Sequence, residues 1–158
     1  ITLGSTGAMD AGLQGPQIAK QHTFGYYWAP TSLYGSYDWT IVEEPAYTAA
    51  CWDEVIIGRD DASYTPAEAC AYESLPIDKG INTGLRETAP DVVAMLEKMM
   101  VGISPISKTA AWALENDVDV SADKIATAKY YLENFEDVWT QWMDDDAVKA
   151  VKEALAAL

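Results

Sequence analysis

The chain has 158 residues, 49% of them hydrophobic, which is enough for one compact domain with a core. Its formal net charge of -15 comes from 25 acidic and 10 basic residues. Such a surface repels phosphate backbones and anionic lipid headgroups, so the charge argues against nucleic acid and membrane surfaces as partners. No apolar run approaches the roughly 18 residues that a membrane-spanning helix needs.

The first half of the sequence predicts short strands around one helix. The sequence opens on ITLGSTG, without an initiator methionine or a signal peptide, and we expect it to be part of a longer protein. Ser5 or Thr6 can cap a helix that continues to Ile18, with an interruption or kink at Pro16. Residues 46–76 are predicted to be rich in loops. β-branched, apolar and aromatic residues predict strands at residues 1–3, 23–28, 37–42, 54–57 and 79–85.

The second half predicts helices. Apolar residues recur at intervals of three and four, which is the pattern of an amphipathic helix. This pattern predicts helices at residues 90–100, 104–116 and 122–143, and a fourth that begins at Asp145. Strand, helix, strand and then a helical tail indicate an α/β fold, with a short β-sheet flanked by helices.

The two cysteines, Cys51 and Cys70, leave three possibilities open. They form a disulfide in an oxidising compartment, or they stay as free thiols in a reducing one. Metal binding is the weakest possibility, because neither cysteine belongs to a CxxC motif and His22 is the only histidine.

The stretch FGYYWAP, residues 24–30, places three neighbouring rings before a proline. On a strand, Tyr26 and Trp28 would share one face and Tyr27 would take the other. An indole at a strand end can hold a quaternary ammonium group, whose methyl groups offer no hydrogen-bond donors to recognise. The alternative is that these rings only fill the core.

The remaining motifs favour structural roles. Gly4-Ser5-Thr6-Gly7 matches no nucleotide-binding loop and is better explained by helix capping. Residues 117–123 resemble the start of a calcium loop, but Ala122 replaces its glycine, and Ser121 as a helix cap explains the segment. The sequence contains no nucleophile elbow and no metal constellation. We therefore expect no enzyme activity, no cofactor and no metal.

Several segments in order resemble one family. They are GSTGAMDAGLQ, YYWAPTSLYGSYDWTIVEEPAY, ACW, EACAY, KGINTGL and ENFEDVWTQWM. Together they are similar to the second half of the substrate-binding proteins that serve ABC importers for glycine betaine, choline, proline betaine and related quaternary amines. The W-x-P at Trp28-Ala29-Pro30 is the most specific of these segments. Many relatives carry histidine and a large apolar residue after it, where this chain has Thr31 and Ser32.

The resemblance implies a lobe of a type II periplasmic binding protein, in which two lobes close on the ligand. Residues 1–158 would be a partial substrate-binding domain, the second half of such a two-lobed binding protein. The ligand's ammonium group would lie in a box of aromatic rings with Trp28 as one wall and Tyr26, Tyr27 and Pro30 beside it. Cys51 and Cys70 would form a disulfide in the periplasm of a Gram-negative bacterium, and the partners would be a membrane permease and an ATPase.

A second hypothesis belongs to a different class of function. In it, the chain is an acidic structural or interaction domain whose helical tail docks on a partner protein. This hypothesis requires Trp139 and Trp142, at the end of the long amphipathic stripe, to be exposed when the chain is alone. A small hydrolase is a third hypothesis, and abundant carboxylates are its only support.

Overall fold

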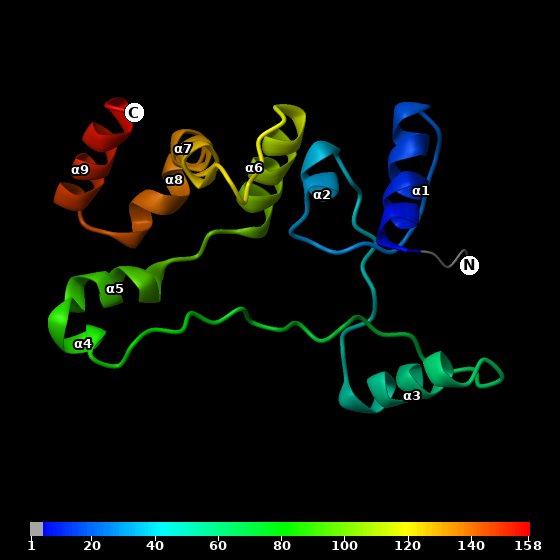
Figure 1. Ribbon diagram of the computed structural model, residues 1–158. Coiled ribbons are helices and arrows are strands. Elements are labelled where there is room, and N and C mark those ends of the chain that lie inside the picture. Colours follow the sequence, from blue (N-terminus) through cyan, green and yellow to red (C-terminus); the bar gives the residue numbers. More distant parts are fainter. Residues whose placement is uncertain (1–4) are drawn as a thin grey trace. The chain divides into compact units, whose positions relative to one another are not determined.

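The computed structural model describes residues 5–158, and every regular element in that range is a helix (Figure 1). The elements are α1 (Thr6–Ile18), α2 (Ser32–Ser36), α3 (Ala49–Asp60), α4 (Leu85–Thr88), α5 (Pro90–Lys98), α6 (Ile103–Glu115), α7 (Lys124–Asn134), α8 (Glu136–Trp139), the 3-10 turn η1 (Thr140–Trp142) and α9 (Asp145–Ala156). No helix among the described residues has both the length and the apolar character needed to cross a bilayer.

The predicted α/β fold is wrong, because residues 5–158 contain no strand and no sheet. Residues 23–28 and 37–42 are irregular, residues 54–57 lie inside α3, and 79–85 are irregular until α4 begins. The predicted strand at residues 1–3 lies outside the described range. β-branched and aromatic residues favour a strand only where a neighbouring strand pairs with it, and these segments have no such partner within the described chain.

Side-chain caps fix where several helices begin. Ser5, one of the two predicted caps, caps α1, and α1 continues through Pro16 to Ile18. The cap of α7 is Asp123, whose carboxylate accepts a hydrogen bond from the Ala126 N–H at 2.9 Å, so the prediction of Ser121 was wrong. Further caps that accept a backbone N–H are Thr31 for α2, Thr48 for α3 and Asp144 for α9.

The helices predicted at residues 90–100, 104–116 and from Asp145 are confirmed as α5, α6 and α9. The predicted single helix 122–143 is wrong, because the chain breaks at Phe135 (φ -129°, ψ 45°). The break lets the Trp139 indole N–H donate to the Leu132 carbonyl at 2.8 Å. Trp139 is thereby completely buried, and this indole with its hydrogen bond anchors the C-terminal half of the core.

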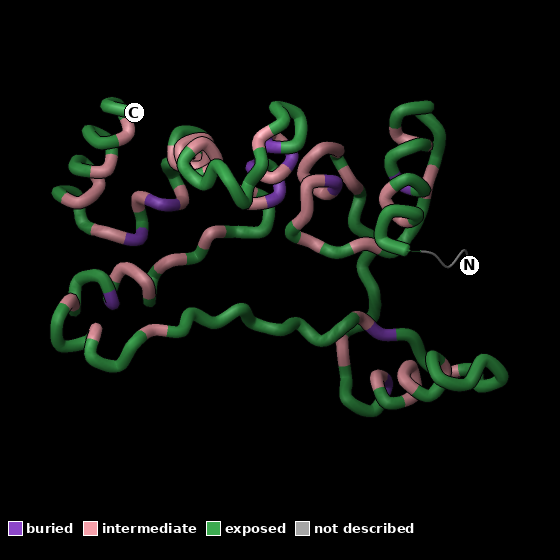
Figure 2. Tube along the Cα trace, in the orientation of Figure 1, coloured by how far each residue is buried: buried purple, intermediate pink, exposed green. Residues whose placement is uncertain are grey.

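Two compact units divide the chain. The first comprises the N-terminal residues to Trp39 together with 82–158, and the second comprises residues 40–81. In residues 40–81, all of which the structure describes, Cys51 and Cys70 are the only buried residues (Figure 2). Their disulfide bond therefore forms the centre of this second unit.

In the first unit, α2 packs closely against α6. Gly35 makes this approach possible, since a Cβ atom at that position would lie 2.1 Å from the carbonyl oxygen of Ser107 and 2.7 Å from the backbone nitrogen of Lys108. No side chain can be placed there without moving a backbone. Leu33 on α2 is buried, as are Ala111 and Ala113 on α6.

Candidate functional site

The predicted ligand residues lie on the irregular segment between α1 and α2. Tyr27 ties this segment to α1, because its hydroxyl donates a hydrogen bond of 2.5 Å to the Asp10 carboxylate. On the other side, the Thr31 hydroxyl donates to the carbonyl oxygen of Trp28 at 3.4 Å, while also capping α2. The segment that carries Trp28 is thus tied to α1 through Tyr27 and to the start of α2 through Thr31.

The three rings form a cluster around Trp28. The Tyr27 and Trp28 rings are stacked, with centroids 4.5 Å apart and planes 19° apart, and the Tyr26 ring lies 6.5 Å from the indole. The strand-based prediction that Tyr27 faces away from Trp28 is therefore wrong, because the segment is not a strand. Trp28 remains 40% exposed, and Tyr26 and Pro30 are exposed too.

Burial and the Asp10 carboxylate both raise the pKa of Tyr27 above its ordinary value of 10.0. Desolvation is the larger cause, and the hydrogen bond to a carboxylate adds to it because the bond requires the phenol proton. The Tyr27 ring is therefore neutral at physiological pH and stays an electron-rich surface against the indole. A half-exposed indole backed by neutral rings is able to attract a cation electrostatically.

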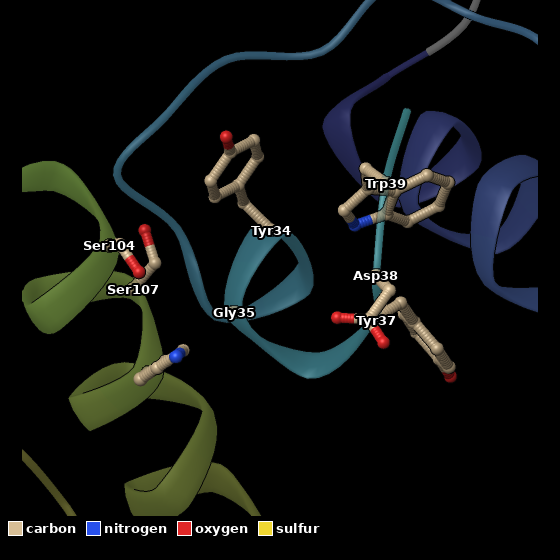
Figure 3. A pocket seen from close by; sticks show the side chains of 8 residues that line it. Tyr34, Gly35, Tyr37, Asp38, Trp39, Ser104 and Ser107 are labelled. Carbon is tan, nitrogen blue, oxygen red and sulfur yellow. The ribbon is translucent and has the colours of Figure 1, made fainter. Parts of the chain in front are cut away.

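A pocket of about 260 Å³ lies elsewhere in the first unit, between α2 and α6 (Figure 3). None of the residues in the Trp28 cluster lines it. The lining residues come from α2 and its following segment and from α6: Tyr34, Gly35, Tyr37, Asp38, Trp39, Ser104, Ser107 and Lys108. The sequence offered one local signal for it, the aromatic spacing in YGSYDW, but nothing that linked this stretch to α6.

Cys51 and Cys70 form the disulfide that the family resemblance implied, with a Cα–Cα distance of 6.3 Å. Two ring contacts lie beside it, between Trp52 and Tyr47 and between Trp52 and Tyr72.

In the part of the chain that the structure describes, no group of three histidine, cysteine or acidic side chains is placed to hold a metal ion. The Asp119 carboxylate instead accepts hydrogen bonds from the backbone N–H groups of Ser121 and Ala122.

Trp139 and Trp142 are buried, with 0% and 7% of their surface exposed. The Trp142 ring stacks on Tyr131, whose hydroxyl donates to the Val101 carbonyl at 2.7 Å. An interaction domain that docks through these two indoles would expose them. Their burial therefore counts against that hypothesis.

Comparison with known proteins gives one match. Residues 1–134 match the family described as the substrate-binding domain of the ABC-type glycine betaine transport system. No curated protein and no solved structure matches the chain. The family match covers most of the sequence, and the matched range includes Trp28 and the two cysteines. The chain therefore belongs to the family of substrate-binding domains of ABC-type glycine betaine transport systems.

Proposed function

We propose that this chain binds a quaternary-ammonium osmolyte, such as glycine betaine or choline, as the second half of a two-lobed receptor. The observation that carries the proposal is Trp28, a half-exposed indole within a cluster of rings, in a chain of the glycine betaine family. Tyr26, Tyr27 and Pro30 complete this side of the site. The receptor delivers the solute to a permease and an ATPase in the membrane and does not transform it.

The chemistry of the ligand explains why rings are needed. A quaternary ammonium group carries methyl groups in place of N–H donors, so hydrogen bonds cannot hold its charge, whereas the negative face of an aromatic ring can. One such contact contributes about 0.5–2 kcal/mol, depending on desolvation. A single indole is therefore too weak for a receptor, and we expect the other lobe to supply further rings.

The disulfide and the surface charge fit this role. A Cys51–Cys70 bridge is stable in an oxidising compartment, and we propose that the receptor works in the periplasm of a Gram-negative bacterium. The net charge of -15 attracts cationic solutes weakly. At ionic strengths near the physiological value, salt screens this attraction beyond a distance of about 8–10 Å.

The test is calorimetric titration of the full-length receptor with glycine betaine and with choline, using Trp28→Ala and a matched control. Removal of one cation–π contact of about 0.5–2 kcal/mol is expected to weaken binding by about 2- to 30-fold. Phe24→Ala is the control, because Phe24 is 86% exposed on the same segment. Equal affinity of the Trp28→Ala and unmodified receptors would refute the proposed role of this indole.

A further inference from the structure

The α2–α6 pocket is distinct from the Trp28 cluster and has two chemically different sides (Figure 3). One side, from α2 and the residues after it, carries three aromatic rings and the Asp38 carboxylate. The other side, from α6, carries two hydroxyl groups and the ammonium group of Lys108. All lining residues belong to the first unit, so the pocket does not depend on how the two units are placed.

The aromatic side forms a corner beside a carboxylate. The rings of Tyr37 and Trp39 meet edge to face, with centroids 5.8 Å apart and planes 78° apart. The Trp39 indole N–H donates to the Leu33 carbonyl at 3.2 Å, which fixes the ring in place. Asp38 lies between these two residues in the chain. Two rings and a carboxylate together attract an organic cation.

The α6 side contains a buried hydroxyl that lacks a partner. Ser107 has 0% of its surface exposed, and its Oγ atom makes no hydrogen bond within the described chain. Thr109, on the same helix, satisfies its hydroxyl by donating to the Pro105 carbonyl at 2.9 Å. The Ser107 hydroxyl makes no such bond to a carbonyl of its own helix. A buried polar group without a partner is unfavourable, and an incoming oxygen atom would remove that penalty.

The charged side chains on the two sides of the pocket, Asp38 and Lys108, are free of ion pairs within the described chain and can interact with a ligand. Neither Asp38 nor Lys108 takes part in any of the ion pairs found within residues 5–158, and both side chains are exposed. Negative charge with rings on one side and positive charge with hydroxyls on the other complement a molecule with separated opposite charges. The volume of about 260 Å³ suits a small solute, since it lies below the roughly 300–1,000 Å³ of pockets for drug-sized ligands.

We propose that the α2–α6 pocket is a second binding site, which takes a small zwitterion. The cationic end lies against Tyr37, Asp38 and Trp39. The carboxylate end accepts hydrogen bonds from the Ser104 and Ser107 hydroxyls and lies near the Lys108 ammonium group. None of the residues of the Trp28 cluster lines this site, so the protein would hold a solute here even when the proposed aromatic box is weakened by loss of Trp28.

The test uses the Trp28→Ala protein and follows the Trp39 indole N–H and the α6 amides by NMR. Glycine betaine serves as the zwitterionic probe, tetramethylammonium as the cation and acetate as the anion. We expect glycine betaine to shift signals on both sides of the pocket with millimolar affinity. Tetramethylammonium should shift the Trp39 signal alone and acetate the α6 signals alone, each more weakly. If glycine betaine shifts neither the Trp39 indole signal nor the α6 amide signals, the proposal is refuted.

Two variants in the same background separate binding from folding. Asp38→Asn should weaken glycine betaine binding at the pocket several-fold, as measured by the shifts of the α6 amides. Asp146→Asn, which changes net charge equally at an exposed position on α9, should leave that affinity unchanged. Ser107→Ala should weaken binding while raising the urea midpoint of the free protein, because it removes an unpartnered hydroxyl. A Ser107→Ala protein that is more stable and binds with unchanged affinity contradicts the assignment of the anionic end.

A test of the Trp28 role in the unmodified receptor remains separate from this one. If Trp28→Ala leaves the calorimetric affinity unchanged, the expected NMR shifts at the pocket are not affected. If glycine betaine causes no NMR shifts at the pocket, the expected effect of Trp28→Ala on affinity is not affected. The two proposals can therefore fail independently.

Discussion

Gly35→Ala tests whether the close contact between α2 and α6 holds the first unit together. A Cβ atom there would lie 2.1 Å from the Ser107 carbonyl oxygen and 2.3 Å from its carbon, whereas ordinary contact begins at 3.4 Å. Both atoms belong to the α6 backbone and cannot rotate away. The helices must therefore separate by about 1 Å, and overpacking of this kind costs typically about 1–3 kcal/mol.

The helix propensity of alanine acts in the opposite direction. Gly35 lies inside α2, where alanine is favoured over glycine by about 1 kcal/mol. Since the clash involves backbone atoms, we take the upper part of the overpacking range and expect a net loss of about 2 kcal/mol in the free energy of unfolding. The loss should also loosen the ring corner at Tyr37 and Trp39, which follows α2 directly.

Urea unfolding followed by circular dichroism measures this change, with Gly12→Ala as the matched control. Gly12 lies inside α1 and is exposed, and a Cβ atom added to it would meet no atom within 4 Å. Alanine at this position therefore gains helix propensity without a clash, and we expect Gly12→Ala to raise stability by about 0.5–1 kcal/mol. A Gly35→Ala protein as stable as this control would refute the close packing of α2 on α6.

Further predictions concern the disulfide, the Tyr27 hydroxyl and the cap of α7. Reduction of Cys51–Cys70 should lower the free energy of unfolding by roughly 3 kcal/mol, because the bridge closes a loop of 19 positions and supplies the buried residues of the second unit. Limited proteolysis of the reduced protein should then cut residues 40–81 first. Unchanged resistance to the protease would contradict this prediction. The raised pKa of Tyr27 means that its contribution to stability is fully present below pH 10 and is lost as pH rises through the raised pKa. Asp10→Asn should bring that pKa back toward 10.0, as measured by tyrosinate absorbance against Tyr27→Phe, and an unchanged titration would exclude the contact. Asp123→Ala should remove the cap of α7 at a cost of about 1 kcal/mol, read from the urea midpoint, with Asp123→Asn as the control that keeps most of the cap.

The sequence predicted the features that depend on near neighbours. The helices α5, α6 and α9 follow from apolar periodicity and from residues such as Pro90 and Asp144 at their starts, because an α-helix satisfies its hydrogen bonds within one segment. The family was likewise predicted from the order of short motifs around Trp28, and the match over residues 1–134 confirmed it.

Features that depend on distant residues were decided by the tertiary structure. Whether residues 23–28 become a strand depends on a pairing partner that no local pattern reveals, and without one in the described chain the rings stack in an irregular segment. The break at Phe135 allows Trp139 to fold back on its own preceding helix, where the indole is buried and donates to the Leu132 carbonyl. The pocket joins Asp38 to Ser107 only because Gly35 lets two helices approach, and such long-range contacts leave no periodic signal in the sequence.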